Sequence, residues 1–313
     1  MKLLFGHGYL GSRITQLWRG EKQDYRIASR GMGQAANLHH NFGEWQPLIA
    51  NVCDPRTLTN LPQAETVVYS VGYERNSRST SSVDAKVPTI HDVYAGGVKN
   101  VLDALENQIA KSGAEPPLFI YVSSTGVYGD AGGGWVDERT ECRPTREGGK
   151  ASLAAEQVIA NHPLGKKSIV LRLAGIYGPD RIPRREPLLR GEPIDAPADG
   201  YLNLIHVEDA ARVVVAAEKK FADYHSSDNQ PSLPQTYCVS DGMPGLRREY
   251  YTELARLLNA PEPTFTAPCP TSPAALRAES DKRISNAKLV RDLGVEFAYP
   301  SFREGLAAIV GGA

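Results

Sequence analysis

The stretch KLLFGHGYLGSRITQLWR, residues 2–19, decides the fold that we predict for this chain. Its first four residues are typical of a short buried strand, and residues 9–19 carry apolar side chains at helical spacing. Between them, Gly6, Gly8 and Gly11 complete the pattern G-x-G-x-x-G. A strand, a glycine turn and a helix in this order hold the pyrophosphate of a dinucleotide against the first amides of the helix. We therefore predict a dinucleotide-binding turn; a glycine turn without a ligand is the alternative.

A different physical reason favours glycine at each of these three positions. Gly6 permits the tight turn, Gly8 lets the backbone approach the phosphates, and Gly11 lets the helix lie close to the strand. The residues between them lie beside the same phosphates. The predicted cofactor contacts in the turn are Gly6, His7, Gly8, Tyr9, Leu10 and Gly11.

The composition is that of an ordinary soluble globular protein, because 41% of the 313 residues are hydrophobic and 23% are charged. The net charge of -1 gives no reason to expect a nucleic-acid partner. No apolar run approaches the roughly 18 residues that a membrane span needs. The chain starts directly in a predicted strand, so we expect no signal peptide. We predict a cytoplasmic protein that has no membrane partner.

The cysteines and histidines are not arranged as disulfide or metal sites. No C-x-x-C pair occurs, and widely spaced thiols are typical of a reducing compartment. The pair at residues 39–40 has no further His or Cys at ligand spacing, so we expect a surface loop there and no metal site. The expected free thiols are Cys53, Cys142, Cys238 and Cys269.

A positive charge after the second predicted strand, residues 25–29, favours NADP over NAD. About 20 residues past the glycines, an NAD enzyme carries an acidic side chain that binds the ribose 2′-hydroxyl. This chain has Ser29 and Arg30 there. A guanidinium pairs with a 2′-phosphate, which a carboxylate would repel. We predict NADP, with NAD as the second choice; a solvated arginine at a strand end is the structural alternative.

Further predicted strands and helices alternate, as they do in a doubly wound parallel sheet of the α/β class. Ligands bind outside the carboxyl ends of such strands. The strands are predicted at 47–52, 66–71, 118–123 and 169–174. A predicted helix at 90–109 contains Gly96 and Gly97, which make sense if another backbone or the cofactor comes close there. The predicted cofactor contacts at the strand ends are Asn51, Val52, Ser70, Val71, Gly72, Ser123, Gly175 and Ile176.

The pattern changes after residue 178, where proline, arginine and glycine become frequent. We predict a cofactor-binding domain at 1–178, to which part of 202–240 returns, and a smaller substrate-binding lobe at 179–313. Loops 74–86 and 180–200 are expected to shape the substrate pocket.

Several motifs, taken together and in this order, resemble the extended short-chain dehydrogenase/reductase superfamily, the NAD(P)-dependent epimerase/dehydratase-like proteins. They are the N-terminal glycines, FIYVSSTGVYG (119–129), Lys150, RLAGIYGPDR (172–181), NLIHVEDAA (203–211) and KRISNAKL (282–289). The resemblance implies a Rossmann-like sheet of about seven strands and a C-terminal substrate lobe. The glycine spacing departs from the usual G-x-x-G-x-x-G of this group, because Phe5 takes the first place.

The resemblance also implies catalytic residues. The family uses a Ser or Thr, which falls on Ser124, and a Tyr-x-x-x-Lys, whose lysine falls on Lys150; the tyrosine position holds Arg146. In the family, the tyrosine exchanges a proton with the substrate while hydride moves, and the lysine lowers the tyrosine pKa and holds the ribose. Arginine gives up no proton at usable pH. The chain therefore resembles an atypical branch that lacks the tyrosine.

The replacement has two consequences for the predicted site. Arg146 and Lys150 share a helix face at i and i+4, so two cations lie beside the nicotinamide and suit an anionic ligand group. The proton has to come from another donor, and Tyr128, Tyr177 and water are the alternatives.

Two functions remain open. The first is an oxidoreductase or epimerase-like enzyme that acts on a small hydroxyl- or carbonyl-bearing substrate; Ser124, Lys150 and the substrate-lobe motifs favour it. The second is a non-catalytic NADP-binding sensor, which the missing tyrosine favours. Relatives often dimerise through a helix pair that includes the Lys150 helix, so the resemblance also implies a homodimer.

Overall fold

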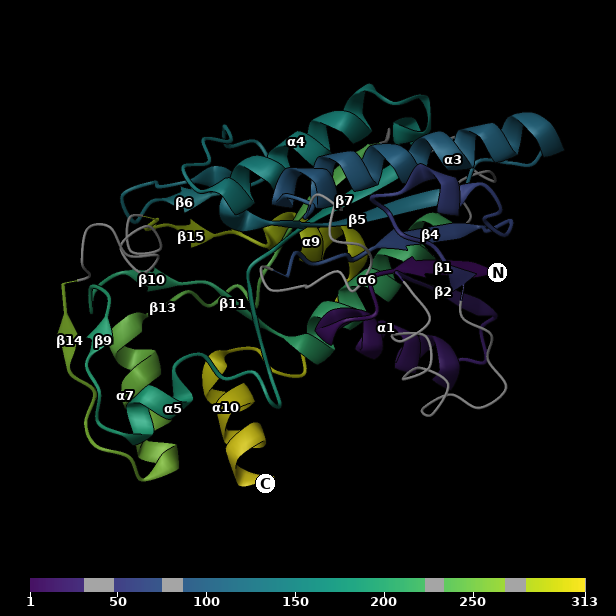
Figure 1. The fold of residues 1–313 in the computed structure, drawn as a ribbon. Coiled ribbons are helices and arrows are strands. Elements are labelled where there is room, and N and C mark those ends of the chain that lie inside the picture. The colour runs from purple at the N-terminus through teal and green to yellow at the C-terminus, as the bar shows by residue number, and fades with distance from the viewer. Residues whose placement is uncertain (31–47, 75–86, 223–233, 268–279, 313) are drawn as a thin grey trace. The chain divides into compact units, whose positions relative to one another are not determined.

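A seven-stranded parallel sheet is the largest element of the computed structural model, which describes residues 1–30, 48–74, 87–222, 234–267 and 280–312. Its strand order is β12-β7-β5-β4-β1-β2-β3 (Figure 1). The strands are β1 (Lys2–Phe5), β2 (Tyr25–Ser29), β3 (Leu48–Ile49), β4 (Thr66–Tyr69), β5 (Leu118–Ser124), β7 (Ser168–Leu173) and β12 (Gln235–Val239). This sheet confirms the predicted α/β, Rossmann-like fold class.

The first strand lies where the order of the sheet reverses. β1 pairs with β2 on one side and with β4 on the other, so that Phe5 lies between Ala28 and Tyr69. All four residues of β1 are buried, as expected for a parallel strand that is covered on both faces. In open α/β sheets, ligands bind at the carboxyl ends of the strands next to such a reversal. The end of β1, where the glycine turn begins, is that place in this sheet.

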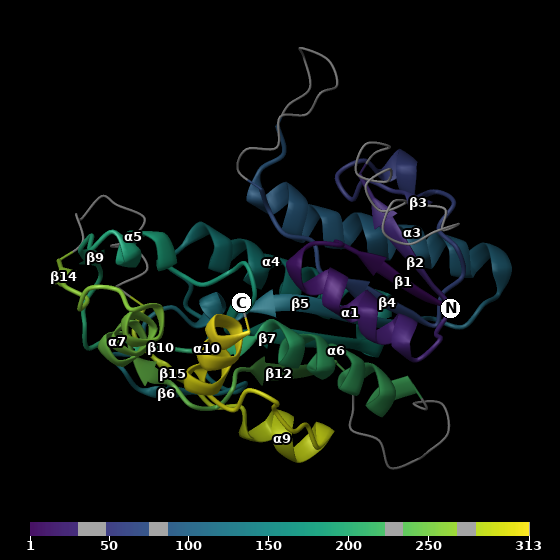
Figure 2. The ribbon, with the colours of Figure 1, turned by 90° about the horizontal axis from the view of Figure 1, so that it is seen from below.

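Helices cover both faces of the sheet. α3 (Gly97–Ser112) and α4 (Glu147–Asn161) lie on one face, and α1 (Tyr9–Gly20) and α6 (Val207–Ala222) on the other (Figures 1 and 2). α1 packs through Leu10, Ile14 and Trp18, which recur at every fourth position. Among the described residues, no helix is both long enough and apolar enough to cross a bilayer.

The segment before α3 winds differently from the predicted helix. Residues Asp92–Gly96 form a π-helix, η2, and α3 follows directly. A Cβ on Gly97 would collide with the Tyr69 hydroxyl and would lie 3.0 Å from Cγ2 of Val52. The close approach at Gly97 is therefore made by side chains of the fold. The Tyr69 hydroxyl donates a hydrogen bond to the Val93 carbonyl at 2.6 Å.

The chain divides into two compact units that alternate along the sequence. Unit 1 comprises Met1–Ser123, Lys150–Leu171 and Val214–Thr236, and unit 2 comprises Ser124–Gly149, Arg172–Val213 and Tyr237–Ala313. In unit 1, the buried Glu218 carboxylate binds Lys2 Nζ at 2.8 Å and accepts a hydrogen bond from Trp18 Nε1 at 2.9 Å. Residues from the first and last segments of unit 1 therefore share one buried ion pair.

Unit 2 combines short strand pairs with helices. Tyr177, Tyr250, Phe302 and Leu306 belong to its apolar core. Its paired strands are β8 (Gly175–Tyr177) with β11 (Leu204–His206), β6 (Trp135–Val136) with β15 (Arg283–Ile284), β10 (Tyr201–Leu202) with β13 (Gly245–Leu246), and β9 (Ile194–Asp195) with β14 (Phe265–Thr266). Its helices are α5 (Arg185–Leu189), α7 (Arg247–Leu258), α9 (Ala287–Leu293) and α10 (Phe302–Gly311).

Some sequence predictions fall outside the described residues. These are the loop with the histidine pair at 39–40, Cys269, and the predicted pocket loop at 74–86 apart from Glu74. Among the described cysteines, Cys53, Cys142 and Cys238 form no disulfide.

Candidate functional site

In the glycine turn after β1, two of the glycines have no room for a side chain, whereas the third has room for one. Gly6 has a φ of +93°, and a Cβ on it would collide with the Ser70 carbonyl and lie 2.6 Å from Val71 N. A Cβ on Gly11 would collide with the Gly6 carbonyl, whereas nothing lies within 4 Å of one on Gly8. The fold itself therefore requires glycine at two positions. At Gly8, the backbone borders open space.

The open glycine marks the N-terminus of α1. Gly8 is the N-cap residue of the helix, and among the described residues no side chain caps the helix and no acidic residue stands in its first turn. No acidic side chain therefore offsets the positive end of the helix dipole within this first turn. His7 turns toward the helix: its Nε2 lies 2.9 Å from Thr15 Oγ1, and burial lowers its pKa. This turn fits a pyrophosphate group.

The predicted 2′-phosphate residue has an acidic partner. Arg30 follows β2, and its Nη2 lies 3.0 Å from Oε2 of Glu74, a residue five positions beyond the end of β4. Both side chains are exposed, at 42% and 67%. The sequence placed Glu74 in the predicted pocket loop but did not indicate its pairing with Arg30, because the two positions are 44 residues apart.

Several predicted contact residues use their side chains within the fold. The Asn51 side chain accepts a hydrogen bond from Cys53 N at 3.1 Å, and Val52 is buried. The Ser123 hydroxyl donates to the buried carboxylate of Glu156. At Ser70, the backbone N donates to the Phe5 carbonyl at 2.8 Å, which holds the end of β4 against β1. These residues shape the carboxyl edge of the sheet.

Other predicted contacts lie at exposed or open positions. A Cβ on Gly72 would meet nothing within 4 Å, and Val71 is half-buried. Gly175 and Ile176 begin β8 in unit 2, where Gly175 is exposed. Lys150 is exposed on α4 and belongs to unit 1, as the glycine turn does.

In unit 2, Ser124 and Arg146 both border Gly126. The Ser124 Oγ accepts a hydrogen bond from Gly126 N at 3.1 Å and caps the short helix η3 (Thr125–Tyr128). A Cβ on Gly126 would lie 3.2 Å from Ser124 Oγ and 3.7 Å from Arg146 Nη2. The structure therefore brings these two predicted residues together.

A second glycine, Gly149, allows the close packing that sets the position of Arg146. A Cβ on Gly149 would collide with the Gly126 carbonyl and would lie 2.9 Å from Cβ of Pro144. The start of α4 packs directly on the turn after Ser124 for this reason. The helix begins at Glu147, so Arg146 immediately precedes it.

The two candidate tyrosines are buried in unit 2. The Tyr128 hydroxyl lies 3.0 Å from Cys238 Sγ and accepts a hydrogen bond from Arg172 Nη1 at 2.8 Å. The Tyr177 hydroxyl donates to the Ser301 carbonyl at 3.3 Å. Burial raises the pKa of both phenols well above the usual range. These bonds and the burial disfavour either phenol as the proton donor.

A buried lysine of unit 2, Lys282, has a pKa closer to neutrality than an ordinary lysine has. Lys282 donates hydrogen bonds to the Gly129 carbonyl at 2.8 Å and to the Ser280 hydroxyl. Burial, assisted by the positive charge of Arg146, lowers the pKa of Lys282 to about 8. The sequence contained Lys282 only as part of the KRISNAKL motif, and nothing in that motif indicated its closeness to Arg146.

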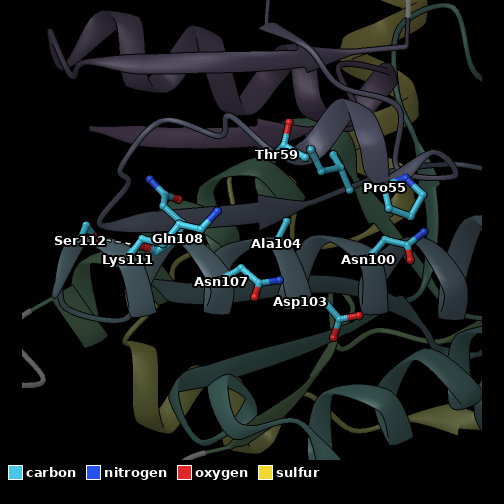
Figure 3. Close-up of a pocket in the computed structure, with 10 residues that line it drawn as sticks. Pro55, Thr59, Asn100, Asp103, Ala104, Asn107, Gln108, Lys111 and Ser112 are labelled. Carbon is cyan, nitrogen blue, oxygen red and sulfur yellow. Dashed lines mark hydrogen bonds between the residues drawn. The ribbon is translucent and has the colours of Figure 1, made fainter.

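A surface pocket lies elsewhere in unit 1, between α3 and the short helix η1 (Pro55–Leu58) (Figure 3). Its volume is about 560 Å³. The lining residues are Pro55, Leu58, Thr59, Asn100, Asp103, Ala104, Asn107, Gln108, Lys111 and Ser112. None of the predicted site residues lines it, so it is separate from the glycine turn. Within the described part of the chain, no three His, Cys, Asp or Glu side chains gather as metal ligands would.

Comparison with known proteins identifies the family. The sequence profile of the NAD dependent epimerase/dehydratase family matches residues 3–228. The chain belongs to this family. The Escherichia coli K12 protein YeeZ is 28% identical over 250 residues, which are 80% of this chain and 77% of YeeZ. The part of the predicted resemblance that concerns epimerase/dehydratase-like proteins is thereby confirmed.

Two solved structures show the same fold. A conserved protein of unknown function from Silicibacter pomeroyi DSS is 28% identical, with a TM-score of 0.75 over 100% of this chain and 98% of that chain. The UDP-glucose 4-epimerase of Thermus thermophilus, solved as a complex with NAD, is 18% identical, with a TM-score of 0.69 over 99% and 98% of the two chains.

Proposed function

We propose that this chain binds a nicotinamide dinucleotide at the glycine turn and acts as an oxidoreductase or epimerase-like enzyme on a small hydroxyl- or carbonyl-bearing substrate. The observation that carries the proposal is the open space at Gly8. Gly6 and Gly11 are required by the packing of the turn, but Gly8 is not. A phosphate group that approaches the backbone explains a glycine at that position.

The cofactor, when bound, would supply or accept a hydride. The amides at the start of α1 bind its pyrophosphate, Arg30 binds a 2′-phosphate, and Lys150 binds the nicotinamide ribose. NADP is our proposal within a family that is NAD-dependent. The support for it is the guanidinium after β2, where an NAD enzyme carries a carboxylate.

The substrate residues that we propose are Ser124 and Arg146. Ser124 Oγ orients the reacting oxygen, and Arg146 binds an anionic group of the substrate. Their shared contact with Gly126 supports a joint role. Because Arg146 keeps its proton, and Tyr128 and Tyr177 are bonded inside unit 2, water is the proton source that we propose.

A second candidate function is a non-catalytic nucleotide sensor. Arg146 favours it, because the position that carries the proton-exchanging tyrosine in related enzymes holds a guanidinium. A sensor would bind NADPH at the same turn and would catalyse no hydride transfer. Turnover of nicotinamide with a panel of small alcohols, aldehydes and ketones separates the two functions.

The binding part of the proposal is tested at Gly8. In Gly8→Asp, the new side chain enters open space, so we expect the unfolding temperature to be maintained. Its carboxylate repels the pyrophosphate, so NADPH binding in a fluorescence titration weakens by about tenfold or more. The control is Gly20→Ala, another open glycine, at the other end of α1. Equal NADPH affinity in Gly8→Asp and the unmodified protein would overturn the proposal.

A further inference from the structure

The ion pair between Arg30 and Glu74 lies at the carboxyl edge of the sheet in unit 1. Arg30 follows β2 and Glu74 belongs to the segment after β4, and β1 lies between these two strands. The pair therefore joins the two strand ends on either side of the glycine turn. Its Nη2–Oε2 distance is 3.0 Å.

The two partners have opposite preferences for the ribose 2′ position of a dinucleotide. A carboxylate accepts a hydrogen bond from the 2′-hydroxyl of NAD, and a guanidinium binds the 2′-phosphate of NADP. Most dinucleotide sites of this architecture place one such group after β2. This chain supplies the cation immediately after β2 and a carboxylate from the segment after β4.

We propose that Glu74 moderates the preference between NAD and NADP by competing with the 2′-phosphate for Arg30. This inference rests on the proposed function, because it needs a dinucleotide at the glycine turn. An NADP phosphate displaces the Glu74 carboxylate from Arg30. With NAD, Glu74 stays on Arg30 and accepts the hydrogen bond of the 2′-hydroxyl.

The exposure of the pair limits how strongly Glu74 opposes NADP. An ion pair between side chains that are 42% and 67% exposed is weak, and its loss changes an equilibrium constant by up to about fivefold. A phosphate carries more charge than the carboxylate and forms stronger bonds with the guanidinium. The chain should therefore bind both dinucleotides, with a preference that Glu74 moderates.

The test uses Glu74→Gln in the full chain, which removes the charge and keeps the size. Dissociation constants for NADPH and NADH are measured by fluorescence titration at one salt concentration. We expect the NADPH constant to fall by up to about fivefold and the NADH constant to rise by about twofold or more. In Arg30→Ala, we expect NADPH to weaken by about tenfold, with little change for NADH.

Two further variants isolate the competition. In the double variant Arg30→Ala/Glu74→Gln, the gain in NADPH affinity from Glu74→Gln should be smaller than it is when Arg30 is present, because the competition acts through Arg30. The matched control is Glu21→Gln, which breaks another exposed ion pair of unit 1, the 2.7 Å contact of Glu21 with Lys219 beyond the far end of α1. It should leave both constants unchanged.

The outcomes distinguish this inference from the proposal beneath it. If the unmodified protein binds both dinucleotides and Glu74→Gln leaves the ratio of the two constants unchanged, Glu74 has no role in the choice and this inference alone is wrong. If the unmodified protein binds neither dinucleotide, the proposed function fails and the inference fails with it.

Discussion

Arg146 is the residue whose chemistry departs most from what the family resemblance implies. Its guanidinium and the Ser124 hydroxyl border the same glycine. A guanidinium in this place binds anions and holds its proton, so the residue changes both the ligand and the proton path that we propose. Two substitutions at this position test the two roles.

In Arg146→Tyr, we expect oxidoreductase turnover to appear or to rise by about a hundredfold, because a positioned general acid or base contributes at least that much. The measurement is nicotinamide absorbance with a panel of small ketones and aldehydes. Arg143→Tyr, at an exposed arginine that pairs with Glu141, is the control. If Arg146→Ala leaves the affinity for anionic ligands unchanged, the anion-binding role is wrong.

Asp241 should make the free energy of unfolding depend on pH. The side chain is 7% exposed; Oδ1 accepts a hydrogen bond from Met243 N at 2.9 Å, and Oδ2 has no hydrogen-bond partner among the described residues. Burial, assisted by the negative charges of Glu304 and Asp209, raises the pKa of Asp241 to about 7. An unfolded aspartate titrates near 4. The folded state therefore binds this proton more tightly than the unfolded state does.

The stabilisation from that proton is complete below about pH 4 and is lost as the pH rises through about 7. Asp241→Asn carries no charge, so its free energy of unfolding should exceed that of the unmodified protein at pH 8, by up to about 4 kcal/mol, and match it near pH 4. Urea unfolding at several pH values measures the difference. A difference between the two proteins that does not vary with pH would contradict this assignment.

At the scale of elements, β1 and α6 are joined by the buried ion pair of Lys2 with Glu218. The side chains are 10% and 4% exposed, and Trp18 of α1 donates to the same carboxylate. In Lys2→Met, the carboxylate remains buried without its cation, so we expect a loss of about 3 kcal/mol of unfolding free energy. Lys219→Met breaks an exposed pair with Glu21 and should cost under about 1 kcal/mol. Equal losses in the two variants would show that burial does not strengthen the first pair.

The sequence predicts elements best where one local pattern is sufficient. The predicted bounds of β1 and β2 are confirmed, because each is a compact run with a clear end. The third strand was predicted at 47–52, but β3 is only Leu48–Ile49. Two residues pair with Ala28 and Ser29, and the chain then turns at Asn51. Such an end depends on how far the neighbouring strand reaches.

In the candidate site, too, the sequence predicts what depends on a local pattern and does not predict what depends on the packing of distant segments. The motif indicates why Gly6 and Gly11 are glycines, since their close contacts lie within the turn and the adjacent strand end. It does not indicate Glu74, because the order of the strands brings that carboxylate to Arg30. The contact of Gly149 with Gly126, which sets the position of Arg146, likewise arises from the packing of α4 on the turn after β5.

At the scale of the whole molecule, each of the two units is built from three separate segments that alternate along the sequence. Unit 1 needs Val214–Thr236 to supply Glu218 for Lys2 and Trp18. We therefore expect a fragment of residues 1–178 to fail to fold, although it contains the glycine turn. Circular dichroism and urea unfolding of the fragment test this. A cooperative transition would show that the last segment of unit 1 is dispensable.

This interleaving restricts how such a gene can recombine. A single crossover could not transplant unit 2 into a relative, because three separate segments, at 124–149, 172–213 and 237–313, would have to be inherited together. A chimaera whose single junction lies between residues 2 and 218 would inherit the carboxylate at position 218 from one parent and its lysine at position 2 from the other.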